Sequence, residues 1–268
     1  MQWCRCHLVS PVLSDYPGSM TGFRQPFVST IREQTLTVAT YNVHRSIGTD
    51  GVHDVGRTAE VIAETGASVL ALQEVEDHSS DPDALARATG MTAIPGPTLS
   101  GPDSNYGNLL LTRLAIESSE SVDLSWAERE PRGVIDARLR TPSGQRIRCL
   151  ATHLSLARRE RLYQHRLLMT LLASEWEGPT LVMGDFNEWR PFAATLRALN
   201  SLLGPARARR SFPARFPLLP LDRIWIAPAH MLVSVETLRT PLARRASDHL
   251  PVVACLNTAV VPNDPITG

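Results

Sequence analysis

The feature that most constrains this chain is a short apolar run at residues 180–183, which stops abruptly in Gly-Asp-Phe-Asn at 184–187. A partly β-branched run of this length is typical of a buried strand. Asp185 and Asn187 follow at its carboxyl end, the edge at which open α/β sheets build their sites. Their side chains can point to one side of an extended backbone and suit a hard cation or a phosphoryl oxygen. Taken alone, such an Asp is more often a turn residue or helix cap.

Other strand ends carry the same kind of chemistry. The strand-like runs 36–42, 69–74 and 148–153 end in Asn42, Glu74 and His153, respectively. Near the C-terminus, Asp248 and His249 stand directly before the apolar run 250–256. One polar residue at a strand end means little, but this set in one domain-sized chain predicts a shared site.

Hydrophobic periodicity predicts further alternation of strands and helices. Strands are expected at 35–42, 68–74, 105–112, 116–124, 133–139, 146–153, 221–227, 231–238 and 250–256. Helices are expected at 55–65, at 157–176, at 191–202, and over a short stretch that ends at 88 and is capped by Asp81 or Asp83. In helix 157–176, the residues expected to face the core are Leu162, Leu167, Leu168, Leu171 and Leu172. The stretch 204–220, rich in Pro and Arg, is expected to be a loop.

The order of these motifs resembles the endonuclease/exonuclease/phosphatase superfamily, which includes deoxyribonuclease-I-like nucleases, inositol-polyphosphate 5-phosphatases and neutral sphingomyelinases. The resemblance extends from about 35 to 256. It rests on Tyr-Asn at 41–42, Leu-Gln-Glu-Val at 72–75, Tyr-Gly-Asn at 106–108, Glu-Pro-Arg-Gly at 130–133, Thr-His-Leu at 152–154, Gly-Asp-Phe-Asn at 184–187, Leu-Asp-Arg-Ile at 221–224 and Ser-Asp-His at 247–249. It implies an α/β (α+β) fold, a four-layer α-β-β-α sandwich with two central, mostly antiparallel sheets. It also implies hydrolysis of phosphate esters with Mg²⁺, for which Mn²⁺ could substitute.

The resemblance implies that the acidic and amide residues bind the metal ion and contact the substrate phosphate. Glu74 is the first choice as metal ligand, because a hard cation needs a carboxylate oxygen; a surface Glu after a strand is the equal alternative. Asn42 would lie beside it. Asp185 would be the base or an outer carboxylate, and Asn187 would donate its amide to a phosphoryl oxygen. Asp248 would lie near the metal or orient the neighbouring histidine.

Two histidines are the candidates for proton transfer and phosphate contact. His249 would move a proton or stabilise the phosphate, and His153 would contact the scissile phosphate from the other side. Asp222 would orient His153 or the amide network, although an ion pair with Arg223 explains it nearly as well. Whether Asp185 or His249 takes the proton from water stays open.

Substrate contacts are less constrained. Asn108 and Tyr106 are expected to approach the phosphate, while Arg132 is either a phosphate contact or, slightly favoured, half of a structural ion pair. Arg215 and its neighbours could flank the site and hold extra phosphates, or could simply be solvated. The two arginine clusters concerned are Arg207, Arg209, Arg210 and Arg215 in the loop, and Arg158, Arg159 and Arg161 at a helix N-terminus. The loop that contains His44, Arg45, Gly48 and Gly51 is expected to be polar and flexible, and it is a further candidate for the rim of the substrate cleft.

Charge excludes a strongly basic surface over the whole molecule. All 27 Lys+Arg positions are Arg, yet 27 acidic residues balance them at a formal net charge of zero and a pI near 7.1. Genome composition is the simplest explanation of the Arg usage. Arg does grip phosphate bidentately where Lys cannot. A pI near neutrality lacks the global field of a tight duplex binder.

Length fits one domain of this kind, with 35–258 as the domain, 1–34 as an N-terminal extension and 259–268 as a tail. Met20 could be the true start. No stretch approaches the roughly 20 apolar residues of a membrane span. Cys149 and Cys255 lie in strand patterns and Cys4 and Cys6 in the extension, so free thiols in a reducing compartment, the cytoplasm, are expected. No heptad pattern is present, and a monomer is expected.

The sequence therefore predicts a metal-dependent phosphodiesterase, nuclease-like, acting by in-line attack of water. Nucleic acid is the first substrate class, and a phospholipid or phosphoinositide headgroup is the alternative. A phosphatase, or a catalytically silent phosphate-binding module on the same fold, remains as a further hypothesis. The sequence does not separate endo from exo action.

Overall fold

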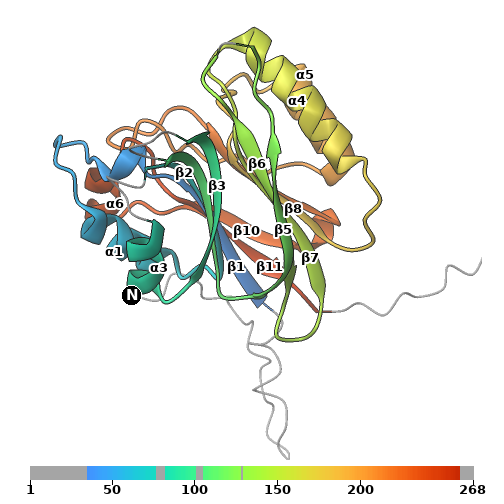
Figure 1. Ribbon diagram of the computed structural model, residues 1–268, viewed down its shortest axis with the longest axis horizontal. Helices are drawn as coiled ribbons and strands as arrows, with labels where there is room; N and C mark the ends of the chain where they lie inside the picture. Colours follow the sequence, from blue (N-terminus) through green and yellow to red (C-terminus); the bar gives the residue numbers. More distant parts are fainter. Residues whose placement is uncertain (1–34, 77–81, 101–104, 128, 260–268) are drawn as a thin grey trace, which may run out of the picture.

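The computed structural model describes residues 35–76, 82–100, 105–127 and 129–259. Two β-sheets pack face to face, and helices cover the outer face of each, so the predicted four-layer sandwich is confirmed (Figure 1). The predicted extension 1–34, which contains Cys4, Cys6 and Met20, lies outside the described residues, as do Asp81 and the tail from residue 260. Within the described residues, no helix has the length and apolar character needed to cross a bilayer.

The first sheet has six strands in the order β10-β11-β1-β2-β4-β3. Its strands are β1 (Thr35–Asn42), β2 (Val69–Glu76), β3 (Thr92–Ser100), β4 (Asn105–Thr112), β10 (Leu232–Thr237) and β11 (Val252–Asn257). Three helices lie on its outer side: α1 (Val55–Thr65), α3 (Pro82–Thr89) and α6 (Pro241–Ala246). One-turn 3₁₀ helices, η2 (His44–Ser46) and η3 (Ala229–Met231), complete this half.

The second sheet has five strands in the order β5-β6-β7-β8-β9. Its strands are β5 (Ala115–Asp123), β6 (Gly133–Arg140), β7 (Arg146–His153), β8 (Thr180–Asp185) and β9 (Asp222–Ala227). Helices α4 (Arg158–Leu172) and α5 (Ala194–Leu203) cover its outer face.

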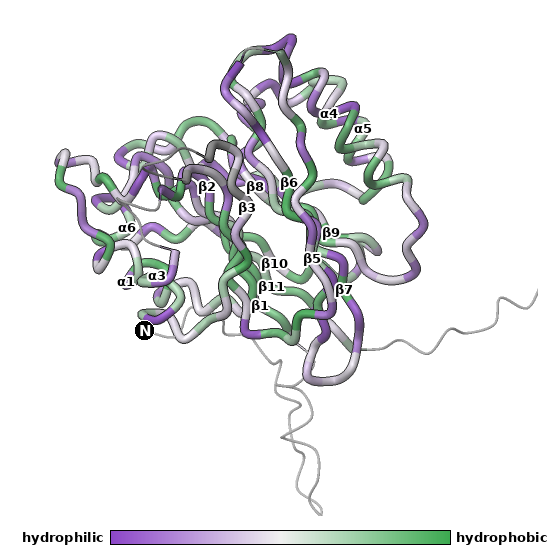
Figure 2. The backbone as a smooth tube through the Cα atoms, viewed as in Figure 1, coloured by the Kyte–Doolittle hydropathy of each residue, from purple (hydrophilic) through white to green (hydrophobic). Residues whose placement is uncertain are grey.

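The largest apolar cluster fills the space between the two sheets. Val38 and Leu110 of the first sheet and Ile135 and Met183 of the second belong to it. Figure 2 shows the apolar colouring of the inner strands β1, β10 and β11. Removing these side chains from water fixes the two sheets against each other, and with them the edges at which the strands end.

Strand register brings the polar strand ends together. In the second sheet, β7 and β8 are parallel and pair His153 with Asp185, while antiparallel β9 pairs Asp222 with Asp185. In the first sheet, parallel β1 and β2 pair Asn42 with Gln73, one residue before Glu74. Both sets of ends meet at one edge of the sandwich.

One strand and one α-helix are absent from the sequence prediction, as are the two one-turn 3₁₀ helices. β3 contains Pro95, Gly96 and Pro97, which favour a turn, but as an edge strand it pairs only with β4 and tolerates proline. The short helix α6 was not expected either; it begins at a proline after Thr240, whose side chain accepts a hydrogen bond from the backbone N–H of Ala243.

Helix α4 is shorter than predicted, since it ends at Leu172 rather than 176. Of the five leucines expected to face the core, Leu168 is fully buried, and Leu167, Leu171 and Leu172 are partly buried and pack against the same cluster. The other buried side chains on this helix are polar: Glu160, Arg161, Gln164 and His165. Periodicity did not predict these four, because their burial depends on partners inside the protein.

Candidate active site

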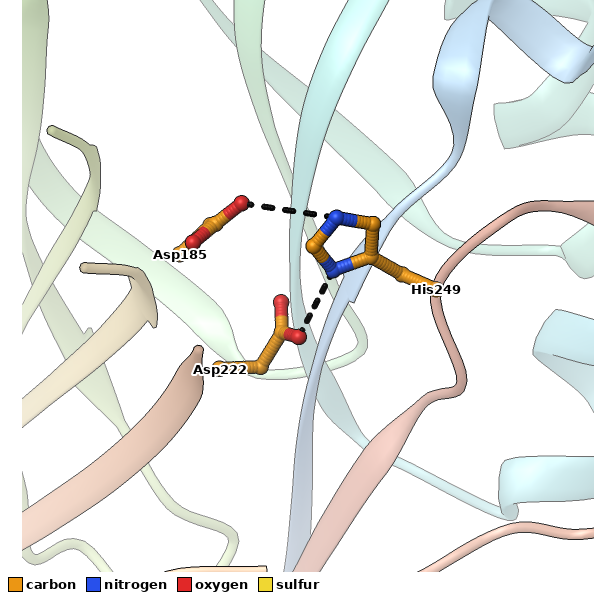
Figure 3. A group of neighbouring side chains, drawn as sticks. All are labelled: Asp185, Asp222 and His249. Atoms are coloured by element: carbon orange, nitrogen blue, oxygen red, sulfur yellow. Dashed lines mark hydrogen bonds and ion pairs between the residues drawn. The ribbon is translucent and has the colours of Figure 1, made fainter. Parts of the chain in front are cut away.

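At the edge of the sandwich where the polar strand ends meet, the buried carboxylate of Asp222 and the imidazole of His249 form the centre of the site. His249, which precedes β11, places Nδ1 2.8 Å from Oδ2 of Asp222 at the start of β9. Its other ring nitrogen, Nε2, faces Oδ2 of Asp185 at 3.8 Å (Figure 3). The hydroxyl of Ser211 donates a second hydrogen bond to the same oxygen of Asp222. His249 is therefore held in one orientation, with its free edge toward Asp185.

Asp185, at the end of β8 in the second sheet, contacts side chains from both sheets. Its Oδ2 accepts a hydrogen bond from Asn42 Nδ2 at 3.3 Å and lies 3.7 Å from Nε2 of His153. Its Oδ1 accepts from the backbone N–H of Asn187 at 2.9 Å. The side chain is 1% exposed, so every one of these contacts acts without competition from bulk water.

Asn42 links Asp185 to Glu74 in the first sheet. Its Nδ2 also donates to Oε1 of Glu74 at 2.9 Å, and its Oδ1 accepts from the backbone N–H of His44 at 3.0 Å. Glu74 sits at an irregularity in the β2–β4 pairing with φ of 59°. A non-glycine residue in this left-handed region is uncommon and is often found at functional sites.

Asn187 and His153 form the opposite wall. Asn187 also has a positive φ, 49°, and its Nδ2 donates to the carbonyl oxygen of Leu154 at 2.8 Å and lies 3.3 Å from His153 Nε2. The sequence Gly-Asp-Phe-Asn thus turns back on itself so that carboxylate and amide face the same histidine. The predicted convergence of these two residues is present in the geometry.

Burial sets the protonation of the two histidines in opposite directions. Burial, together with the charges of Arg132 and His249, holds the pKa of His153 well below its ordinary value. Burial would also lower the pKa of His249, but the charge and hydrogen bond of Asp222, helped by Asp185, raise it above its ordinary value. One neutral and one charged imidazole therefore face the same carboxylate.

The pKa of Asp185 is raised as well. Burial is the main cause and the charge of Asp222 adds to it, while His249 and the hydrogen bonds from Asn187 and Asn42 act in the other direction. Because burial destabilises the ionised form of this carboxylate, the group is suited to accept a proton or to face a cation.

Two sets of donors could hold a metal ion. Asp185, Asp222 and His249 offer ligand atoms within 4.8 Å of one another. In the other set, the amide of Asn42 stands between the carboxylates of Asp185 and Glu74. The carboxylate oxygens of Asp185 and Glu74 match a hard cation; Asn42 turns its NH₂ group toward both, while its Oδ1 accepts from the backbone N–H of His44. An ion on Nδ1 of His249 would displace its hydrogen bond to Asp222.

The structure corrects the assignments of two acidic residues. Asp222 orients His249 and not His153, because the register of β9 aims its carboxylate at the loop before β11. Asp248 does not orient His249: its Oδ1 lies 3.4 Å from Ser247 Oγ and 4.0 Å from His44 Nδ1, and its side chain is 40% exposed.

Two of the predicted substrate contacts, Asn108 and Tyr106, are buried side chains. The amide of Asn108 donates to the carbonyl oxygen of Gly133 at 3.0 Å. Tyr106 is buried beneath the guanidinium of Arg45, and burial followed by the charge of Glu74 raises the pKa of its hydroxyl. Both residues therefore line the Glu74 side of the edge.

Arg132 forms the kind of ion pair that the sequence slightly favoured, and its charge also acts on His153. Its guanidinium forms two hydrogen bonds to Glu130, at 2.8 and 3.1 Å, and is 8% exposed. Arg215 lies in a separate surface hollow beside Phe216 and Arg245. Within the described residues, neither arginine has a hydrogen bond to the catalytic side chains.

Several of the other arginines hold backbone rather than phosphate. Arg161 is buried and donates to the carbonyl oxygens of Ser155 and Leu156. Arg207 and Arg209 donate to carbonyl oxygens of β10, each at 2.7 Å. The guanidinium groups of these three are engaged with backbone carbonyls, a role that neither of the two sequence alternatives, phosphate contact or solvated side chain, includes. Arg158 and Arg159 remain exposed.

Two serines in the site were missed as functional residues. Ser211 supports Asp222, and Ser247 ties the end of β1 to the histidine loop: its Oγ donates to the carbonyl oxygen of Asn42 at 2.8 Å and accepts from the N–H of His249 at 3.1 Å. Ser247 belongs to the Ser-Asp-His motif, so the sequence could have marked it as a site residue. Ser211 lies in an irregular loop, where no motif marks it.

Comparison with known proteins agrees with this geometry. The sequence profile described as "Endonuclease/Exonuclease/phosphatase family" matches residues 39–249. An Escherichia coli K12 protein, YbhP, described as uncharacterized, is 36% identical over 167 residues. The aligned region covers 57% of this chain and 63% of YbhP, so the chain spans less than two thirds of that relative.

Solved structures show the same fold at low sequence identity. A mannosyl-6-phosphatase from Bacteroides thetaiotaomicron is 18% identical, with a TM-score of 0.64 over 82% of this chain and 98% of its own. D. rerio TDP2, complexed with a single-strand DNA product, is 18% identical, with a TM-score of 0.65 over 84% and 99%. Identities this low establish the fold alone.

Proposed function

Because this chain belongs to the endonuclease/exonuclease/phosphatase family, we propose that it hydrolyses phosphodiesters with the help of a divalent metal, magnesium or manganese. The observation that carries the proposal is the meeting of Asp185, His249 and His153 at one buried edge, where no two of the three are neighbours in sequence. Two imidazoles directed at one buried carboxylate are suited to proton transfer at a phosphate, which favours catalysis over a silent binding module.

We assign the metal to the Glu74 side of the site. Glu74 and Asn42 would hold it, with Asp185 facing it from the second sheet. A bound cation would polarise the phosphoryl oxygen and neutralise its charge. The hydrogen bond between Asp222 and His249 then stays intact, which is the reason to prefer this donor set. Asp248 remains a candidate for an outer contact to the metal.

The chain's own residues supply the remaining chemistry. Asp185, which is buried and lies 3.8 Å from Nε2 of His249, would take a proton from the attacking water. His249, held charged by Asp222, would donate to a phosphate oxygen as negative charge develops there. Neutral His153 and the amide of Asn187 would hold the phosphate from the second sheet. Cys149 and Cys255 are buried and neither forms a disulfide, which is compatible with a reducing, cytoplasmic location for this activity.

A matched pair of chromogenic esters tests this function. We expect magnesium-dependent turnover of bis-para-nitrophenyl phosphate, slower turnover of the mono-ester, and loss of the diester activity in His249→Ala. Turnover of the mono-ester alone would replace the phosphodiesterase with a phosphatase. Failure of both esters with metal present would favour a binding module. Mn²⁺ binding followed by electron paramagnetic resonance separates the two donor sets, because Glu74→Gln should weaken it more than Asp222→Asn.

A further inference from the structure

The guanidinium of Arg132 is buried, but the carboxylate that neutralises it is half exposed. The side chain of Arg132 is 8% exposed and donates to Glu130 at 2.8 and 3.1 Å, while the side chain of Glu130 is 50% exposed. The Nε of Arg132 is buried and has no hydrogen-bond acceptor within the described residues. The ion pair therefore leaves one N–H group of a buried cation without a partner.

Another ion pair of the chain shows how a purely structural pair differs. Arg148, 1% exposed, pairs with Asp136, whose side chain is fully buried. That carboxylate is enclosed together with its guanidinium and cannot leave without disrupting the sheet. Glu130 can leave, because its carboxylate faces solvent and its hydrogen bonds within the described part of the chain go to Arg132.

Strand register places Arg132 beside the histidine of the second sheet. β6 begins at Gly133 and runs antiparallel to β7, which ends at His153, so Arg132 stands at the same edge. The carbonyl oxygen of Gly133 accepts hydrogen bonds from Asn108 of the first sheet and Thr152 of the second, each at 3.0 Å. The charge of Arg132 reaches the site, since it is, after burial, the next cause of the lowered pKa of His153.

A hollow beside Arg132 leaves room for an anion. It has a volume of about 300 Å³, whereas one water takes up roughly 30 Å³. The hollow lies between β3 of the first sheet and strands β5 and β6 of the second, and Gly96, Thr98 and Ser121 line it together with Arg132. Solvent and small ligands can therefore reach the space at the guanidinium.

A phosphoryl group is the anion that fits these observations. A guanidinium binds carboxylate and phosphate with the same planar, bidentate geometry, so that one anion can replace the other. A buried guanidinium without a counter-charge is costly, and an exchange of anions leaves Arg132 neutralised before and after. A phosphate also carries more acceptor oxygens than a carboxylate, and can supply the acceptor that Nε lacks.

We propose that Arg132 binds a phosphate oxygen of the substrate and that the carboxylate of Glu130 occupies the guanidinium until the substrate displaces it. The identity of the anion as a phosphodiester rests on the proposed function; the exchange of anions on Arg132 does not. Glu130 thereby sets the affinity of the site. The observed dissociation constant exceeds the intrinsic one by the factor that the closed ion pair imposes.

Phosphate binding by Glu130→Gln tests the proposal without requiring catalysis. The full chain, with chelator present, is titrated with inorganic phosphate in a calorimeter at constant ionic strength. KM for bis-para-nitrophenyl phosphate is measured separately with magnesium. An ion pair with an exposed partner favours its closed form by up to about fivefold, so Glu130→Gln should lower both the phosphate Kd and the KM by about fivefold. A purely structural pair predicts no gain in affinity, because its loss would only destabilise the fold.

Asp123→Asn is the matched control. Asp123 lines the same hollow, but its Oδ1 accepts the backbone N–H of Ser125 at 2.8 Å. This variant removes one negative charge from the hollow without freeing the guanidinium, so screening should limit the change in phosphate Kd to less than about twofold. Arg132→Lys keeps the positive charge and loses the bidentate contact, and should raise the phosphate Kd by about tenfold.

The outcomes separate this proposal from the proposed function. Circular dichroism should show each variant folded. Unchanged or weaker phosphate binding by folded Glu130→Gln, no measurable binding by this variant and the wild type, or an equal gain in Asp123→Asn would overturn the proposal. The expected gain in phosphate affinity, with no turnover of either ester by the wild type, would refute the proposed function and leave the exchange on Arg132 standing. Turnover of the diester without that gain would do the reverse.

Discussion

The substitution Asp222→Asn measures how far the site depends on one buried charge. It keeps the shape of the side chain and removes the carboxylate that faces Nδ1 of His249 at 2.8 Å. Asp222 is fully buried and His249 is 5% exposed, so water cannot replace the lost contact. A hydrogen bond to a charged group contributes about 1.5–3 kcal/mol, and breaking a buried charge pair costs about 3–5 kcal/mol.

The shared part of these two ranges, about 3 kcal/mol, sets the expected loss of rate. Since each 1.36 kcal/mol is a factor of ten, kcat for diester hydrolysis should fall by about 10²-fold. The assay is the initial rate of bis-para-nitrophenyl phosphate hydrolysis at saturating magnesium, with thermal unfolding to confirm that the variant is folded. KM should change little, because Asp222 acts through His249 and does not touch the substrate.

Ser211→Ala is the matched control for this reasoning. It removes one hydrogen bond to the same oxygen of Asp222 and leaves the charge beside His249 in place. A hydrogen bond to a charged group contributes about 1.5 kcal/mol at the lower end of its range, so the rate should fall about tenfold, less than in Asp222→Asn. The reasoning is refuted if folded Asp222→Asn retains a rate within about threefold of wild type, or if Ser211→Ala is the slower variant.

Two further predictions concern stability. Gly184→Ala should lower the unfolding free energy by about 3 kcal/mol or more, because a Cβ there would collide with the backbone carbonyl of Thr152; denaturant unfolding that matches the wild type would contradict this. Burial lowers the pKa of His165 below its ordinary 6.5 despite its bond to the Thr195 carbonyl. The unfolded chain therefore takes up this proton more readily, and the contribution of His165 to stability is lost as pH falls below about 6.5. His165→Gln should flatten the decline of Tm between pH 7 and 5, and an unchanged slope would refute the assignment.

The strand ends were predictable from sequence because each is marked by a short apolar run followed by one polar residue. Asn42, His153 and Asp185 end β1, β7 and β8 as those runs predicted, since parallel registers bring such ends to one edge. Glu74 lies inside β2, which continues to Glu76, at an irregularity of the pairing with β4. The family resemblance supplied the layer order, which local periodicity does not contain.

The partners of the polar side chains were not predictable from local sequence. Asp248 is adjacent to His249 in sequence, yet the carboxylate that reaches the imidazole is Asp222, 27 positions away. Only the register of β9 against β8 creates that contact. Arg158 and Arg161 show the same limit: one is exposed and the other is buried against backbone carbonyls. Sequence gives the charge of a side chain, and packing decides what neutralises it.

The most direct test of the central claim is the rate of magnesium-dependent diester hydrolysis by Asp185→Asn beside the wild type. Asp185 joins both sheets and both histidines, so the account predicts a folded variant slowed by at least about 10²-fold, the scale of a general base. Equal rates for the two proteins would contradict the account and place the chemistry away from this edge.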